Sequence, residues 1–203
     1  MMKDEQLDQS VALLIIDMMN TMDFPEADLL IQELKYKLHN MVELKQRCKQ
    51  EHIPVIYIND HYDLWKSDVH AIVSKAMKGK AKDMIKTLIP DDDNYFVFKP
   101  KHSGFFATPL ESLLKHLGVG SLILMGVAGN ICVLFTANDA YMRDYKLFVP
   151  QDCCASNVKE DNDYALKMMK NVLKANISPQ NELNLKKIKK EAFNKKEQTL
   201  YEN

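Results

Sequence analysis

The sequence lacks long apolar runs and carries almost no net charge. None of its apolar stretches reaches the length of a bilayer span. The first ten residues, MMKDEQLDQS, contain no apolar core of the kind that marks a secretory signal. The formal net charge of the 203-residue chain is −1, so it has no basic footprint for nucleic acid. We therefore expect a cytoplasmic protein with neither a membrane nor a nucleic acid as its partner.

Paired cysteine motifs are also missing. The four cysteines include no CxxC, and a chain of this length does not depend on a disulfide framework. Adjacent cysteines rarely offer the separation and side-chain directions that a disulfide requires. We therefore expect free thiols at Cys48, Cys132, Cys153 and Cys154, and we interpret Cys153 and Cys154 as buried.

The glycine-rich fingerprint of dinucleotide-binding enzymes is absent as well. The loop after the first predicted strand reads DMMNTMDF and contains no glycine. A pyrophosphate needs a close approach of the backbone, which the glycines of GxGxxG normally provide. A dinucleotide-dependent oxidoreductase is therefore a poor interpretation, and we expect no cofactor of that kind.

Short apolar runs alternate with longer amphipathic stretches along the chain. The run VALLIID at 11–17 is too short for a helix and is unbroken by polar residues, which is typical of a parallel strand buried on both faces. Other strands are predicted at 55–59, 94–99, 121–127 and 146–150, with a weaker sixth near 175–185. Helices are predicted at 26–50, about 66–87, 108–116, 130–143 and about 160–174.

This alternation predicts an α/β fold, a three-layer α-β-α sandwich with a mostly parallel, five- or six-stranded Rossmann-like sheet. The length suits one domain over residues 1–203. The end of the chain, about 185–203, is highly charged, and we interpret it as a solvated helix or tail.

Polar residues follow several of the predicted strands. Asp17 ends the first strand, Asn59 and Asp60 end the second, Lys99 ends the third, and Cys132 opens the helix after the fourth. In open α/β sheets ligands bind outside the carboxyl ends of the strands. The pattern therefore predicts that these groups meet at one edge of the sheet.

Each of these groups alone has an ordinary structural explanation. Asp17 could cap the next element, Lys99 could extend its amine to solvent, and Cys132 could be a core thiol. Together they form a coherent reactive site. Lys99 and a helix N-terminus would lower the pKa of the thiol, and Asp17 would take its proton and pass it to a leaving group.

Three segments carry a resemblance to a known family. IIDMMN, FKPKHSGFFATPL and GVAGNICVLFTANDAYMRDY resemble the signature segments of the isochorismatase-like cysteine hydrolases, which include nicotinamidases and N-carbamoylsarcosine amidases. The resemblance runs from about residue 10 to 160. It implies that Asp17 is the general acid and base, Lys99 the family's lysine and Cys132 the nucleophile. It also implies a cis peptide between Val127 and Ala128, with the amides of Ala128 and Cys132 as the oxyanion hole.

By the same resemblance, the protein is a hydrolase that cleaves a C–N bond of a small amide, carbamoyl or ureido compound through a thioester. The family needs no organic cofactor and commonly forms homodimers or homotetramers. Two interpretations compete with this one. The first is hydrolysis of an isochorismate-like enol ether without covalent catalysis. The second is a catalytically silent protein of this fold that binds a small molecule or a partner.

The chain departs from the family pattern in two places. Nicotinamidases bind a metal through an Asp-x-His arrangement, but here Asp60 and His61 are adjacent and His70 is distant, so we expect no metal site of that type. The first motif reads Asp-Met-Met-Asn where many members have Asp-x-Gln-Asn. Asn20 remains, and we expect it to support Asp17 or its loop.

Aromatic side chains of the loops are predicted to form the wall of a substrate pocket. We assign substrate binding to Phe24, Asn59, Trp65 and Phe106, with Phe105 as a further member of the wall. The alternative for these aromatic residues is ordinary packing or a subunit interface.

Overall fold

The computed structural model describes residues 10–61 and 68–192, and these residues form three layers around a parallel sheet. The strand order is β3-β2-β1-β4-β5, and β6 pairs with β4. Every pairing between named strands is parallel, which confirms the predicted α/β sandwich. The strands are β1 (Val11–Ile16), β2 (Val55–Asp60), β3 (Tyr95–Lys99), β4 (Ser121–Val127), β5 (Lys146–Phe148) and β6 (Cys154–Ala155).

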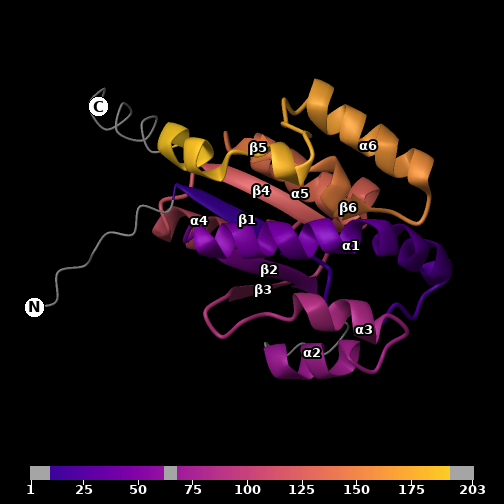
Figure 1. The fold of residues 1–203 in the computed structure, drawn as a ribbon. Helices are drawn as coiled ribbons and strands as arrows, with labels where there is room; N and C mark the ends of the chain where they lie inside the picture. Colours follow the sequence, from indigo (N-terminus) through magenta and orange to yellow (C-terminus); the bar gives the residue numbers. More distant parts are fainter. Residues whose placement is uncertain (1–9, 62–67, 193–203) are drawn as a thin grey trace, which may run out of the picture.

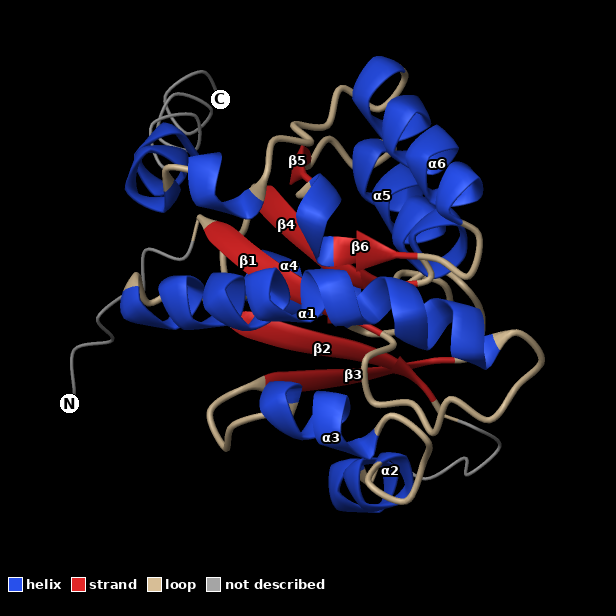
Figure 2. Cartoon of the chain, turned by 45° about the vertical axis from the view of Figure 1, so that its right-hand side comes forward, coloured by secondary structure: helices blue, strands red, loops and turns tan. Residues whose placement is uncertain are grey.

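Helices cover both faces of this sheet (Figures 1 and 2). One face packs against α1 (Ala27–Gln50), α2 (Val69–Ala76) and α3 (Lys82–Ile85), and the other packs against α4 (Leu110–His116), α5 (Leu134–Tyr141) and α6 (Lys159–Asn171). The shorter helical turns are η1 (Lys86–Leu88), η2 (Gly129–Val133), η3 (Gln151–Cys153) and η4 (Gln180–Glu182). No described helix combines the length and apolar character that crossing a membrane requires.

The unbroken apolar sequence of β1 follows from its position in the middle of the sheet. Side chains alternate between the two faces of a strand. Val11, Leu13 and Ile15 therefore enter the core under α1, while Leu14 and Ile16 enter the core under α4, α5 and α6. All six residues of β1 are at most 1% exposed. A polar residue in this strand would be buried on either face, so the first polar group appears only where the strand ends.

Several predicted boundaries differ from the structure. The helix predicted over about 66–87 is divided, with α2 ending at Ala76 and α3 beginning at Lys82. The helix predicted over 130–143 begins with a π-helical turn, η2, before α5. The strand predicted near 175–185 is wrong. That segment contributes one isolated bridge, from Asn176 to Phe148, and the sixth strand is the two-residue β6 instead.

The end of the described chain lies against the sheet as well as in solvent. Residues 185–192 are helical, and Leu185 and Ile188 are buried in the core cluster that includes α1. This agrees with the predicted helix but shows that part of it packs. Residues 193–203 of the predicted charged tail lie outside the described residues.

A glycine allows β1 and β4 to approach closely at the edge of the sheet where the polar residues gather. Gly126 has φ +129°, and a Cβ atom there would lie 2.1 Å from the carbonyl oxygen of Ile16. No other residue type fits this contact without displacing a strand. The chain segments after the two strands, which carry Asp17 and Cys132, are thereby held near each other.

Candidate active site

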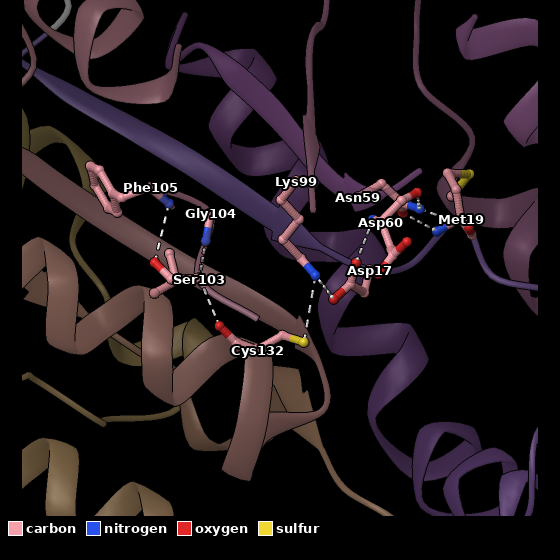
Figure 3. A network of polar contacts seen from close by, with 10 residues as sticks. Asp17, Met19, Asn59, Asp60, Lys99, Ser103, Gly104, Phe105 and Cys132 are labelled. Carbon is pink, nitrogen blue, oxygen red and sulfur yellow. Dashed lines mark hydrogen bonds and ion pairs between the residues drawn. The ribbon is translucent and has the colours of Figure 1, made fainter. Parts of the chain in front are cut away.

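Three side chains from separate parts of the sequence meet at the carboxyl edge of the sheet (Figure 3). Lys99, the last residue of β3, places its Nζ 2.8 Å from Oδ2 of Asp17 and 3.6 Å from Sγ of Cys132. Asp17 follows β1, and Cys132 lies in the π-helical turn after β4. The convergence expected from the strand ends is therefore present in the structure.

Asp17 is held by the backbone as well as by the lysine. Its φ of 52° lies in the left-handed region, which non-glycine residues seldom adopt and which recurs at functional sites. Its N–H donates to the carbonyl of Ile58 at 2.8 Å, and its Oδ1 accepts the N–H of Asp60 at 2.9 Å. The carboxylate is thus fixed by β2 on one oxygen and by Lys99 on the other.

The side chains of Asp17 and Lys99 are almost completely excluded from solvent. The Asp17 side chain is 8% exposed and that of Lys99 2%. Burial raises the pKa of Asp17, and the positive charge of Lys99 opposes this rise. Burial by itself would lower the pKa of Lys99, but the neighbouring Asp17 and Cys132 raise it above its ordinary value. Lys99 therefore stays protonated, and the environment favours proton uptake by Asp17.

The Cys132 thiol does not have the low pKa that the sequence led us to expect. Burial raises the pKa of this thiol to about 12, and the Asp17 carboxylate adds to the rise while Lys99 opposes it. The predicted lowering by Lys99 and the helix is therefore wrong as a net effect. At neutral pH the thiol keeps its proton, and any nucleophilic attack requires a base. Asp17 is in contact with both Lys99 and Cys132 and is the candidate.

The segment before Cys132 leads directly into the π-helical turn that carries the thiol. The peptide bond between Val127 and Ala128 is cis. The Ala128 carbonyl accepts from Ile131 and Val133, so it is turned into the π-helical turn. None of the described residues accepts a hydrogen bond from the Ala128 N–H. The Ala128 N–H, four residues before Cys132 in the chain, is therefore left without an acceptor among these residues.

Asn59 has partners that differ from the predicted substrate contact. Its side chain is buried, with 1% of the residue exposed. Its Oδ1 accepts from the Met19 N–H at 3.0 Å, and its Nδ2 donates to the Met19 and Asp60 carbonyls at 3.0 and 3.2 Å. Both amide donors are therefore used by backbone. The contacts make Asn59 an anchor for the loop that follows Asp17, while Asn20 turns within that loop and accepts from Met22.

The aromatic residues predicted to wall the pocket occupy different environments. Phe24 is partly buried against the core under α1, and Phe106 is 56% exposed. Phe105 is 6% exposed and packs against Tyr145, so it belongs to the core under α4, α5 and α6. Trp65 lies outside the described residues. The structure thus leaves Phe106 and Phe24 as candidates and moves Phe105 into ordinary packing.

The region after β2 does not gather metal ligands in the described residues. His61 follows Asp60 at the end of β2, whereas His70 is exposed in α2. No group of three or more His, Cys, Asp and Glu in the described ranges could hold a metal ion. The donor set that a structural or catalytic zinc would need is therefore not assembled by these residues.

Sequence reasoning missed Thr136, Ser156 and Asn162. Ser156 accepts the N–H of Asn130 and donates to Asn162 Oδ1, so it supports the turn that carries Cys132. Thr136 joins the same turn to the loop after Lys99. A hydroxyl four residues after a candidate nucleophile, in the run CVLFT, is the signal that could have identified Thr136.

Comparison with known proteins identifies the family of this chain. The family model described as Isochorismatase domain matches residues 11–180. The chain belongs to the isochorismatase family. It is a hydrolase of that family, and it is 46% identical over 172 residues to the uncharacterized isochorismatase family protein YaaI of Bacillus subtilis, covering 85% of this chain and 95% of that protein.

Two further relatives of this isochorismatase-family hydrolase have names that state a reaction. The nicotinamidase of Staphylococcus aureus superposes with a TM-score of 0.65 at 27% identity, covering 83% of this chain and 99% of that chain. The ureidoacrylate amidohydrolase RutB of an Enterobacter species is 39% identical over 69 residues, which are 34% of this chain and 30% of that protein. The chain thus resembles the nicotinamidase over most of its length and RutB over a segment.

Proposed function

We propose that this isochorismatase-family hydrolase cleaves a C–N bond of a small amide, carbamoyl or ureido compound through a thioester on Cys132. The observation that carries the proposal is the buried contact of Lys99 with both Asp17 and Cys132. Burying a lysine and a carboxylate together is costly for stability, and here the pair also contacts a half-buried thiol. Acyl transfer uses all three groups, which gives this costly arrangement a function.

The first half of the reaction forms the thioester. As Sγ of Cys132 attacks the carbonyl carbon, the thiol proton passes to Asp17, whose pKa is raised by burial. The negative charge moves to the carbonyl oxygen, where the amides of Ala128 and Cys132 donate to it. When the intermediate collapses, the C–N bond breaks and Asp17 gives its proton to the leaving nitrogen. Ammonia or an amine departs, and the acyl group stays on sulfur.

The second half releases the acid. Asp17, again a carboxylate, takes a proton from a water molecule as the water oxygen attacks the thioester carbon. The C–S bond then breaks, the sulfur recovers the proton held by Asp17, and a carboxylic acid leaves. Lys99 is charged in the resting site, where Asp17 and Cys132 raise its pKa, and we assign to it the compensation of the negative charge that moves between Asp17 and the substrate carbonyl oxygen.

The substrate class in this proposal rests on the relatives. The nicotinamidase and the ureidoacrylate amidohydrolase both act, by their names, on compounds with an amide or ureido C–N bond. Phe24 and Phe106 are the aromatic side chains of the described residues that we propose as part of the pocket wall. We also propose a small homo-oligomer as the working form of the enzyme.

Ammonia release from a panel of small amides, ureido and carbamoyl compounds tests the proposal. Wild type, Cys132→Ala and Cys153→Ala are assayed in parallel, with and without chelator. We expect release by wild type and by Cys153→Ala, because Cys153 is a buried thiol whose pKa is raised by burial. Cys132→Ala should lose activity by about 1,000-fold or more, as nucleophile removal does elsewhere.

Mass spectrometry of the quenched reaction gives the second readout. A wild-type adduct equal to the acyl group, located on Cys132, supports the thioester. A full rate in Cys132→Ala would contradict covalent catalysis and would favour the enol ether hydrolysis considered above. Wild-type silence across both substrate classes would instead favour a binding protein of this fold.

A further inference from the structure

One buried hydroxyl links the nucleophile to the segment that carries the lysine. Thr136 is 0% exposed. Its Oγ1 donates to the Cys132 carbonyl at 2.7 Å and accepts the N–H of Gly104 at 2.9 Å. Gly104 lies five residues after Lys99, in the loop that leaves β3. A single side chain in α5 thus joins the backbone of Cys132 to the backbone of the loop that follows Lys99. Figure 3 shows the Cys132 and Gly104 ends of this link.

The loop at the other end of this link is packed tightly. A Cβ atom at Gly104 would lie 3.0 Å from two carbons of Ile58 in β2, so the loop is pressed against the sheet. The Gly104 carbonyl accepts from Thr108, and Ser103 accepts the N–H of Phe105. Because this loop is fixed to the sheet, it is a firm support for whatever Thr136 holds.

The contact between Cys132 and Lys99 is too weak to set its own geometry. Sγ and Nζ are 3.6 Å apart, and sulfur is a weak hydrogen-bond partner. The thiol also lies in a π-helical turn, a rare and irregular element that is often found at functional sites. The Asp17 carboxylate is a second contact of the thiol, and the backbone that carries Cys132 has to hold the thiol where both contacts can form.

We propose that Thr136 is a positioning residue that fixes the Cys132 thiol relative to Lys99 and Asp17. This inference rests on the proposed function. Serine and threonine hydroxyls in helices often bond the carbonyl four residues earlier, and that bond alone has only a local effect. Here the same oxygen also accepts a hydrogen bond from a second element. Loss of the hydroxyl leaves the Gly104 N–H and the Cys132 carbonyl without this partner inside the protein.

Three variants test the proposal. Thr136→Val keeps the shape and removes the hydroxyl, and Thr136→Ser restores it. Thr87→Val is the matched control, because the Thr87 hydroxyl also bonds a nearby carbonyl, that of Met84, but lies in the exposed turn η1. On a substrate identified in the panel, we expect kcat to fall about 10- to 100-fold in Thr136→Val with little change in KM, as for a displaced reactive group. Thr136→Ser and Thr87→Val should keep kcat within about threefold of wild type.

Alkylation of Cys132 gives a readout that does not need turnover. We expect the pH midpoint of alkylation to move by about half a unit or more in Thr136→Val, because Asp17 and Lys99 both act on the thiol and both effects depend on distance. Thr136→Ser should keep the wild-type midpoint. If wild type hydrolyses no substrate, the proposed function fails, and this shift still decides whether Thr136 positions the thiol.

A folded Thr136→Val protein with wild-type kcat and an unchanged alkylation midpoint overturns the proposal. If this variant does not fold, Thr136→Ala replaces it, since the smaller side chain leaves room for a water molecule beside the two backbone groups. We expect a smaller loss of kcat in Thr136→Ala than in the valine variant. A wild-type rate and midpoint in Thr136→Ala would equally overturn the proposal.

Discussion

Lys99 and Lys45 are two buried lysines among the described residues, and their surroundings differ. The Nζ of Lys45 donates to the Ile89 carbonyl at 2.8 Å and lies 3.3 Å from Asp91. The Asp91 side chain is 42% exposed. Lys99 instead pairs with Asp17, whose side chain is 8% exposed, and contacts a thiol. One lysine has a partner in solvent, and the other has a partner that is buried with it.

The pKa values of the two lysines shift in opposite directions. Burial lowers the pKa of Lys45, and Asp91 only partly opposes this effect. Burial also acts to lower the pKa of Lys99, but Asp17 and Cys132 outweigh it. A solvated carboxylate is screened and therefore stabilises a buried cation less than a buried carboxylate does. Lys45 thus serves to tie a loop to α1, while Lys99 keeps a permanent charge beside a reactive group.

The largest expected effect comes from removing the carboxylate that distinguishes the Lys99 site. Asp17→Asn should lower kcat by about 100- to 10,000-fold, because the general acid and base is lost. The same change should lower the pKa of the Cys132 thiol, since the Asp17 charge raises it. Single-turnover assays and alkylation of Cys132 as a function of pH measure the two effects.

The informative result is that the Cys132 thiol ionises more readily while kcat falls. This combination separates the loss of proton transfer by Asp17 from the electrostatic effect of its charge. Asp91→Asn is the control, since Asp91 pairs with Lys45 and Lys49 at a distance from the thiol. It should leave kcat unchanged. An Asp17→Asn enzyme within tenfold of wild type would remove the acid–base role from Asp17.

The next effect is on stability. Lys99→Met should lower the free energy of unfolding by about 3–5 kcal/mol, because it leaves Asp17 buried without its partner. Lys45→Met should cost only about 1–2 kcal/mol, because Asp91 remains solvated and one hydrogen bond to a charged group is lost. Urea unfolding of both variants measures the difference. Equal losses in the two variants would show that the solvation of the partner does not control the cost.

The smallest effect is the dependence of stability on alkaline pH. Lys99 has a raised pKa in the folded state, so its charge stabilises the fold at pH values below the unfolded pKa of 10.5. This contribution is lost as the pH rises through the folded pKa. A lysine with a lowered folded pKa lowers stability below that pKa, and the cost disappears as pH rises towards 10.5. Relative to Lys45→Met, wild type should therefore gain stability just below pH 10.5. Relative to Lys99→Met, it should lose stability above pH 10.5. The free energy of unfolding, measured for all three proteins across this pH range, tests these opposite shifts. A change of the same sign in both comparisons would contradict them.

The sequence predicted most strands of the sheet, because a strand that is buried on both faces consists almost entirely of apolar residues. The run of β1 is apolar on both faces, and the core of the structure requires this. The two-residue strand β6 carries no such signal, since its pairing with β4 depends on where the chain returns after β5. The strand predicted near 175–185 is wrong because a short segment can pack against the core without forming a β-ladder, and its sequence does not distinguish the two.

The candidate site divides in the same way. Residue type and position at strand ends were enough to predict that Asp17, Lys99 and Cys132 meet, and the distances agree. The hydrogen-bond partners and the burial of each group could not be predicted from the sequence. Asn59 looked like a substrate ligand because it ends a strand beside Asp17, yet its amide is used by the backbone of the next loop.

The sequence alone determined the layered α/β fold, the edge of the sheet where polar groups gather and the chemical types that meet there. Periodicity and strand order carry this information, because parallel strands end on a common edge. Only the tertiary structure decided how those groups titrate and what holds them. The thiol pKa of about 12 depends on burial and on the distance to Asp17, and the link through Thr136 depends on a loop from another part of the chain. Such properties are sums over neighbours in space, and no local pattern encodes them.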